Sequence, residues 1–337
     1  MRIGLLGLGF MGSTHLKAYQ KIPGVEIVAV CSKDEQALTG DLSHIQGNLG
    51  GPGEKVDFSR TRIYRDADAF LADPEMDGVD ICLPTDFHAP AAIVALNSGK
   101  HVLVEKPFAI GPAEADAMLE AGARSGKVLM CAQVLRFFPA YVGLRHALKR
   151  SGKVHSAFFR RRCAAPSWST WLSDSKQSGG GVFDLLIHDI DMALHLFGKP
   201  QAVSATGSED MANGVDLIAA NLHYQDIPSV VITGGWHHIK SYPFSMEFTV
   251  VSDAATYDFN SARGEEVAEY RKSGETQPME QPKCDAYEAE IRYFIECATA
   301  GEQPAVCPPR ESAAAVKLAR LMIEARTRNG EKIPCNL

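Results

Sequence analysis

The first third of the chain alternates short apolar runs with segments of helical pattern, and this alternation restricts the possible folds more than any other feature. Such runs of Val, Ile and Leu are typical of strands buried on both faces of a parallel sheet. The runs are Arg2–Leu6, Val25–Cys31, Val79–Leu83, His101–Glu105 and Val128–Gln133. Helical patterns lie between them at Gly12–Ile22, Ala67–Ala72, Ala89–Asn97 and Pro112–Ser125. We therefore predict a doubly wound α/β domain over residues 1–127.

One segment departs from this alternation. Gly47–Gly53 holds four glycines and a proline within seven residues, so we predict a loop. It is either a flap near a ligand or a surface insertion without function.

The sequence changes character after a helical segment at Ala140–Lys149. Strand-like runs then follow one another, which indicates a mostly antiparallel sheet. They are Val154–Arg162, Ala202–Gly207, Asp216–His223, Val230–Trp236, Ser245–Val251 and Thr256–Phe259. Further helical patterns lie at Ser178–Phe197, Asp285–Thr299 and Glu311–Thr327. We predict an α+β domain over residues 128–337 with a large, open sheet.

Composition limits the classes of partner and compartment. The chain has 337 residues, enough for two domains, and its formal net charge is −7. This balance argues against nucleic acid or an anionic membrane surface as the main partner. The apolar runs are far shorter than the ~20 residues of a membrane span. The eight cysteines include no Cys-x-x-Cys pair and no signal-peptide pattern opens the chain, so we expect a cytoplasmic protein with reduced thiols.

A glycine-rich motif, Gly7-Leu8-Gly9-Phe10-Met11-Gly12, follows the first strand and opens the first helix. Glycines here allow a tight turn, close approach of the backbone to a pyrophosphate, and close packing of helix on strand. The helix N-terminus also offers N–H groups to phosphates. A second strand ends about 20 residues on, as a dinucleotide-binding fingerprint requires. The residues expected to bind a dinucleotide here are Gly7, Gly9, Phe10, Met11 and Gly12.

The residue after the second strand distinguishes NAD from NADP. An acidic residue there accepts a hydrogen bond from the ribose 2′-hydroxyl of NAD and repels a 2′-phosphate. This chain has Ser32 followed by Lys33, and a small hydroxyl beside a cation favours the phosphate of NADP. Asp34 and Glu35 close by could reverse that preference. The expected cofactor is therefore NAD or NADP, with NADP slightly favoured.

The strand His101–Glu105 ends in Glu105-Lys106-Pro107. Because ligands of open α/β sheets lie beyond the carboxyl ends of the strands, we expect Lys106 to project over the nicotinamide. Its ammonium could hold a substrate hydroxyl and stabilise negative charge that develops on that oxygen. The alternative is a solvated lysine at a strand end.

A second candidate for chemistry follows three glycines at Gly179–Gly181. If the chain is helical from Asp184, then Asp184 and His188 are four residues apart and share one face. A histidine titrates near neutral pH and a carboxylate one turn away can orient it, so the two form a candidate general acid/base pair. A capped helix with a core histidine is the alternative. We predict no metal site, because His188, Asp189 and Asp191 do not share a face.

Together these motifs resemble the glucose–fructose oxidoreductase / inositol 2-dehydrogenase (Gfo/Idh/MocA) family of NAD(P)-dependent sugar oxidoreductases. Further markers are Pro84–His88, Gly99–Pro107 and Arg136–Pro139, and the resemblance covers nearly the whole chain. It implies an N-terminal Rossmann domain and a C-terminal α+β domain. It also implies hydride transfer between a nicotinamide cofactor and a secondary hydroxyl of a sugar, cyclitol or related polyol.

The resemblance further implies roles for single residues. Lys106 matches the family's catalytic lysine, and Asp184 and His188 match its Asp-x-x-x-His pair, in which the histidine accepts the proton. Other matches to cofactor-binding positions are Pro84, Thr85, His88 and Glu105. The expected contacts of substrate hydroxyls are Lys106, Arg136, Arg162, Trp171, Asp184, His188 and Asp189. Lys106 and His188 lie in different predicted domains and are expected to face one hydroxyl across an interdomain cleft.

Two alternatives remain within the family. A dinucleotide-binding regulator is expected to lose the lysine or the histidine, both of which are present here. A glycosidase that uses bound NAD as a transient oxidant would show no net change in cofactor redox state. The resemblance also implies a homodimer or homotetramer built through the C-terminal sheet, since the exposed face of an open sheet needs covering.

Overall fold

The computed structural model describes residues 1–47, 53–166 and 170–337, which form two compact units. The first unit contains Met1–Val134 and Asp285–Ala313, and the second contains Leu135–Cys284 and Ala314–Leu337. Most of the predicted loop at Gly47–Gly53 lies outside the described residues.

The units differ from the predicted domains, 1–127 and 128–337, mainly in the segment Asp285–Ala313. This segment packs with the first unit because its helix α9 (Ala286–Ala300) lies against α1 (Phe10–Tyr19). Lys21, just after α1, pairs with Asp285 at 2.9 Å. The local sequence pattern predicts helix α9, but it does not show that α9 packs against α1.

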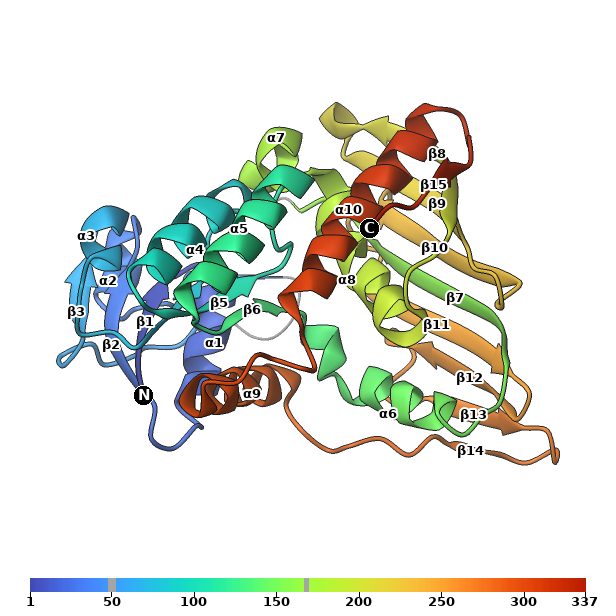
Figure 1. The fold of residues 1–337 in the computed structure, drawn as a ribbon, viewed down its shortest axis with the longest axis horizontal. Helices are drawn as coiled ribbons and strands as arrows, with labels where there is room; N and C mark the ends of the chain where they lie inside the picture. The colour runs from blue at the N-terminus through green and yellow to red at the C-terminus, as the bar shows by residue number, and fades with distance from the viewer. Residues whose placement is uncertain (48–52, 167–169) are drawn as a thin grey trace. The chain divides into compact units, whose positions relative to one another are not determined.

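The first unit is built on a six-stranded parallel sheet with the order β3-β2-β1-β4-β5-β6 (Figure 1). Its strands are β1 (Arg2–Leu6), β2 (Glu26–Cys31), β3 (Arg62–Tyr64), β4 (Gly78–Ile81), β5 (His101–Glu105) and β6 (Leu129–Ala132). Helices α1 and α9 cover one face, and α4 (His88–Asn97) and α5 (Pro112–Ser125) cover the other (Figure 1). Two short helices are α2 (Glu35–Leu38) and α3 (Ala67–Leu71). The predicted doubly wound α/β fold is confirmed.

The strand order fixes where a ligand can approach. The chain passes from β1 outward to β2 and β3, then returns to the other side of β1 for β4. Ligands of such sheets bind beyond the carboxyl ends of the strands, beside the point where the order reverses. The residues that follow β1, β2, β4 and β5 at this edge are Gly7, Ser32, Pro84 and Lys106. Strand β3 was not predicted from the sequence, because this three-residue strand begins with arginine and ends with tyrosine and so contains no apolar run.

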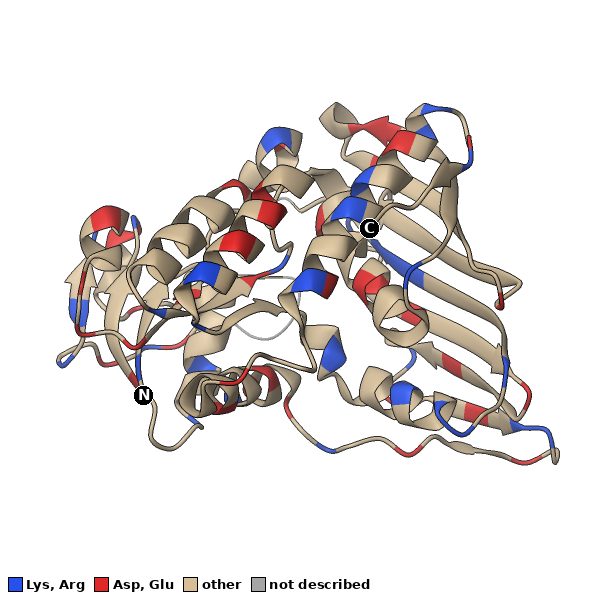
Figure 2. Ribbon diagram, in the orientation of Figure 1, with Lys and Arg blue, Asp and Glu red and all other residues tan. Residues whose placement is uncertain are grey.

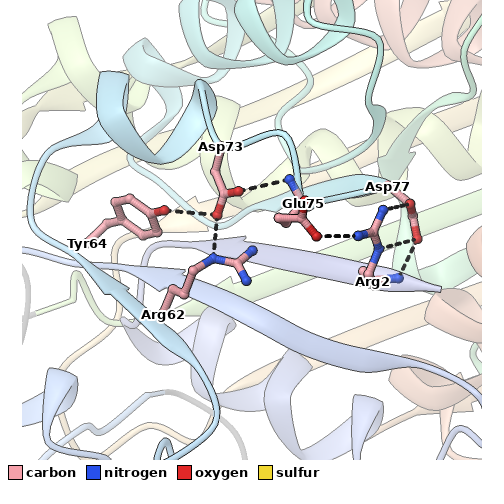
Figure 3. Close-up of polar contacts among 6 residues, drawn as sticks. All are labelled: Arg2, Arg62, Tyr64, Asp73, Glu75 and Asp77. Atoms are coloured by element: carbon pink, nitrogen blue, oxygen red, sulfur yellow. Dashed lines mark hydrogen bonds and ion pairs between the residues drawn. The ribbon is translucent and has the colours of Figure 1, made fainter.

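The connection from α3 to β4 is tied to the sheet by ion pairs (Figure 3). Arg2, the first residue of β1, pairs with Asp77 at 2.9 Å. Arg62, the first residue of β3, donates to Asp73 at 2.7 Å, and the hydroxyl of Tyr64 donates to the same carboxylate at 2.9 Å. These contacts stabilise the first unit and involve no residue of the predicted motifs.

The second unit is built on a nine-stranded sheet with the order β14-β13-β12-β11-β7-β10-β9-β8-β15. All its strand pairs are antiparallel except β7 with β10. The strands are β7 (Val154–Cys163), β8 (Ala202–Asp210), β9 (Val215–His223), β10 (Ser229–Trp236), β11 (Ser245–Ser252), β12 (Ala255–Asn260), β13 (Ala268–Arg271), β14 (Thr276–Pro278) and β15 (Ile333–Pro334). The helices are α6 (Pro139–Leu148), α7 (Ser175–Ser178), α8 (Gly180–Phe197) and most of α10 (Pro309–Thr327).

Only one face of this sheet is covered by helices. Helices α6 and α8 pack on it, with the ring of Tyr141 5.2 Å from that of Phe248 (Figure 1). Ile232 in β10 is fully buried on that side, whereas the next residue, Thr233, is partly exposed. No helix among the described residues covers the opposite face, so the open sheet predicted for the C-terminal part is confirmed.

No helix in the described parts of the chain combines the length and apolar character that crossing a membrane requires. Charged residues of both signs are interspersed over the described elements of each unit (Figure 2). None of the eight cysteines, all at described positions, is in a disulfide.

Candidate active site

Two glycines of the turn after β1 are required by geometry. Gly7 has a φ of 102°, and a Cβ added there would lie 2.3 Å from the carbonyl oxygen of Cys82. A Cβ on Gly12 would lie 2.0 Å from the carbonyl oxygen of Gly7. These residues therefore bring α1 close to β1 and β4.

Gly9 differs, because neither its backbone nor its packing requires a glycine. Its φ of −75° suits any residue, and a Cβ added there would meet no atom of the described residues within 4 Å. Gly9 is the N-cap of α1, and no side chain caps that end, nor does an acidic residue lie in the first turn. Phe10 and Met11, both half-buried, form that turn. Open space in front of uncapped N–H groups fits the pyrophosphate of a dinucleotide.

The end of β2 presents a hydroxyl whose acidic neighbours are engaged elsewhere. The Ser32 hydroxyl accepts a hydrogen bond from the backbone N–H of Asp34 at 3.1 Å. The Asp34 carboxylate caps α2 and lies 2.7 Å from Nε2 of His44. Glu35 accepts two hydrogen bonds from Arg65, at 2.7 and 2.8 Å. The carboxylates that could favour NAD are thus held by other groups.

The segment after β4 contains Pro84, Thr85 and His88, which form a 3-10 turn and the start of α4. Thr85 and His88 are buried. The ring nitrogens of His88 lie 2.8 Å from the carbonyl oxygens of Pro107 and Leu83, and burial lowers the pKa of His88. His88 therefore ties the end of β4 to the end of β5. Its ring nitrogens do not make the cofactor contact that was predicted, which leaves Pro84 and Thr85 as candidates there.

Lys106 is the only residue between Val102 and Ala109 that is not buried. It directly follows β5, as predicted, and its backbone N–H donates to the Glu105 carboxylate at 2.9 Å. Glu105 is 5% exposed, and its other oxygen lies 3.1 Å from Nε2 of His15. These contacts of Glu105 argue against its predicted role at the cofactor, because this carboxylate is turned into the first unit.

Helix α8 confirms the predicted shared face of Asp184 and His188. Over Gly180–Leu194 every residue is buried except these two, which are partly exposed. They are four residues apart, so they form one narrow accessible strip on an otherwise buried helix.

The start of α8 is fixed by packing that the sequence indicated only in part. Gly179 and Gly180 have φ values of 80° and 85°, and a Cβ on Gly181 would lie 2.5 Å from the ring of Trp236. The backbone N–H of Val182 donates to Asp216 of β9 at 2.9 Å. Asp216 thus caps the helix from a distant strand, and no local pattern around it could reveal this role.

Two predicted substrate contacts lie instead in buried ion pairs. Asp189 accepts hydrogen bonds from Arg161 at 2.9 and 3.1 Å, and Arg136 donates to Asp191 at 2.8 and 2.6 Å. All four side chains are almost fully buried. These pairs argue against Arg136 and Asp189 as substrate contacts, since each charge is neutralised inside the protein by its partner. The same pairing argues against Asp189 and Asp191 as metal ligands.

The structure also argues against Arg162 as a substrate contact. Arg161 contacts Asp189 of α8, so the alternation of a strand turns Arg162 to the opposite, uncovered face. There it pairs with Glu247 at 2.5 Å. Trp171, in a half-buried 3-10 turn, remains a candidate for substrate contact.

Residues 1–133 match the family model described as "Oxidoreductase family, NAD-binding Rossmann fold", and residues 147–258 match "GFO/IDH/MocA C-terminal domain". The chain is 33% identical to D-apiose dehydrogenase of Paraburkholderia graminis, over 67% of this chain and 58% of that protein. It is 27% identical to myo-inositol 2-dehydrogenase of Thermotoga maritima, over 91% of this chain and 90% of that protein.

Among solved structures, levoglucosan dehydrogenase in complex with NADH and levoglucosan superposes with a TM-score of 0.86. The superposition covers 100% of both chains at 19% identity, a level that shows a shared fold alone. The two family models together span most of this chain, in the order that its sequence motifs predict. The chain therefore belongs to the Gfo/Idh/MocA family of oxidoreductases.

Proposed function

We propose that this protein transfers a hydride between a nicotinamide dinucleotide and a secondary hydroxyl of a sugar, cyclitol or related polyol. The observation that carries the proposal is the accessible strip of Asp184 and His188 on α8, where every other residue of Gly180–Leu194 is buried. On a stretch of helix whose other residues are buried, a partly exposed carboxylate and imidazole one turn apart have the placement that acid/base chemistry needs.

Each element would contribute one part of the reaction. When bound, the nicotinamide ring supplies the site that accepts or donates the hydride. Gly9 and the N-terminus of α1 hold the phosphates. His188 takes the hydroxyl proton, Asp184 orients the imidazole, and Lys106 holds the substrate oxygen and stabilises its negative charge. Ketone reduction uses the same groups in reverse.

The end of β2 supports NADP as the preferred cofactor. Ser32 and Lys33 replace an acidic residue there, and Asp34 is engaged with His44 and the start of α2. Arg65 follows β3 directly beside Ser32, since the Ser32 N–H donates to the carbonyl of Tyr64 at 3.2 Å. Arg65 is itself paired with Glu35, so the support for a 2′-phosphate rests on the Ser32 hydroxyl and the neighbouring Lys33.

The proposed function is tested by following nicotinamide absorbance with a panel of sugars and polyols, each with NAD and with NADP. We expect steady reduction of the cofactor with at least one secondary alcohol, faster with NADP. Tight cofactor binding with no turnover of any compound would instead favour a regulator. Cleavage of glycosides without net cofactor reduction would favour the glycosidase.

The uncovered sheet face supports a homo-oligomer. Every second residue of the strands of the second unit lies on this face. Val231, Thr233 and Val251 are among them and are partly exposed. Such a face is commonly buried against a second copy of the same chain.

A further inference from the structure

A group of buried ionisable side chains lies in the first unit behind the strand ends that carry Gly7 and Lys106. His15 of α1 and Asp80 of β4 are fully buried, and Glu105 of β5 is 5% exposed. Nδ1 of His15 lies 2.8 Å from Oδ2 of Asp80, and Nε2 lies 3.1 Å from Oε1 of Glu105. The Nδ1 contact is a hydrogen bond, whereas the Nε2 contact is a close approach without hydrogen-bond geometry, so one imidazole lies between carboxylates of two neighbouring strands.

A charged ring suits a position between two buried carboxylates. A neutral imidazole carries a single N–H and would leave one buried carboxylate facing a lone pair. Burial lowers the pKa of His15, but the charge of Asp80 and the hydrogen bond to it outweigh this effect, so the pKa stands well above the ordinary value of a histidine. The titratable groups of the elements packed around His15 are Tyr19 of α1, Asp80 of β4, Cys82 just after β4, Glu105 of β5, and Tyr287 and Glu290 of α9.

The bridge ends at the candidate catalytic lysine. The second oxygen of Glu105 accepts a hydrogen bond from the backbone N–H of Lys106 at 2.9 Å. The contacts thus run from Asp80 through His15 and Glu105 to the backbone from which the Lys106 side chain projects. His15 also lies one turn beyond Gly12 in α1, so the same ring connects the glycine turn to the end of β5.

We propose that His15 and Asp80 are positioning residues, which hold Glu105 so that it fixes the backbone of Lys106 at the reacting oxygen. The kinetic consequence of this arrangement rests on the proposed function, but the arrangement itself can be observed without turnover. His15→Gln removes the charged bridge, and Glu105→Gln keeps an acceptor for the Lys106 N–H while removing the charge. His101→Gln, at the opposite end of β5, is the matched control.

The first test uses the full chain saturated with cofactor. Nitrogen NMR of the His15 ring should show both nitrogens protonated at pH 8, and hydrogen exchange at the Lys106 amide should be about tenfold faster or more in His15→Gln than in the wild type or His101→Gln. A neutral His15 ring at that pH, unchanged Lys106 exchange in His15→Gln, or stoichiometric zinc in the purified protein would overturn the proposal.

The second test is a double-mutant cycle in kcat. His15→Gln and Glu105→Gln should each lower kcat about tenfold or more in the wild type, with cofactor affinity within about twofold. In the Lys106→Ala background the same changes should cost less than about twofold, because the group they position is absent. Equal losses in both backgrounds would overturn the proposal. A wild-type protein without hydride transfer would instead refute the proposed function, and the NMR and exchange results would still decide the bridge.

Discussion

The fold does not require a glycine at position 9, whereas the approach of the expected ligand does. A side chain there has open space in the structure, so Gly9→Val should fold normally and still block the approach of a pyrophosphate. We expect cofactor affinity to fall about tenfold or more, measured by calorimetric titration, with a small drop in melting temperature because valine is a poorer N-cap than glycine. Gly12→Ala is the contrasting variant, because its Cβ would lie 2.0 Å from the carbonyl oxygen of Gly7 and should lower stability. Undiminished affinity in folded Gly9→Val would contradict this account.

Ser32 tests the cofactor preference at the scale of one side chain. A carboxylate at this position would repel a 2′-phosphate and accept from a free 2′-hydroxyl, so Ser32→Asp should shift the ratio of kcat/KM from NADP toward NAD by about tenfold or more. The ratio is measured with one substrate and both cofactors. A wild-type protein that already prefers NAD by a wide margin would refute the assignment of Ser32 and Lys33.

Several residues show what the sequence could and could not predict. Local motifs predict Gly7, Lys106, Asp184 and His188 as candidates. The placement of Arg162 on the uncovered face had an available signal: Phe159 and Cys163 are apolar and two positions from Arg161, which places Arg161 on the buried side of β7. Long-range partners, such as Asp189 for Arg161 and His15 for Glu105, leave no local signal because they are 28 and 90 positions apart.

At the scale of elements, α8 depends on a cap from another strand. Asp216 accepts from the N–H of Val182 and from Arg326 at 2.6 Å, and it is 2% exposed. Asp216→Ala should lower the free energy of unfolding by about 1–3 kcal/mol, because a buried N–H and a guanidinium lose their acceptor. It should also lower kcat, since the freed helix end lies one turn before Asp184.

The control for this variant is Asp73→Asn, which disturbs the contacts of Arg62 and Tyr64 in the first unit (Figure 3). Denaturant unfolding should show lower stability for both variants, whereas kcat should fall only for Asp216→Ala. An equal effect of both variants on kcat would mean that α8 is not positioned through Asp216.

At the scale of the whole molecule, the sequence predicted both architectures because hydrophobic periodicity is a local property. The parallel sheet follows from apolar runs alternating with helical patterns, and the open sheet from strands that follow one another. The assignment of Asp285–Ala313 to the first unit could not be predicted, since it depends on contacts between α9 and α1 across most of the chain.

The uncovered sheet face leads to a prediction about assembly. If this face is buried between copies of the chain, then Val231→Lys, which places a charge at its centre, should dissociate the oligomer. Light scattering after size-exclusion chromatography should show a dimer or tetramer for the wild type and a monomer for the variant. His155→Asn, at an exposed position near the start of the neighbouring strand β7, should leave the mass unchanged. A monomeric wild type would contradict the proposed assembly.

The central claim is that His188 of the second unit and Lys106 of the first act on one substrate hydroxyl. Lys106→Ala should lower kcat and also raise KM, because the ammonium contacts the oxygen in both the ground state and the transition state. His188→Asn should lower kcat alone, because a general base acts only as the proton leaves.

The most direct measurement is the single-turnover rate of cofactor reduction by the best polyol of the panel, compared between the wild type and His188→Asn. The account predicts a loss of about 10²–10⁴-fold in this rate, with cofactor affinity within about twofold of the wild type and no loss in His155→Asn. A folded His188→Asn variant that reduces the cofactor at the wild-type rate would contradict it.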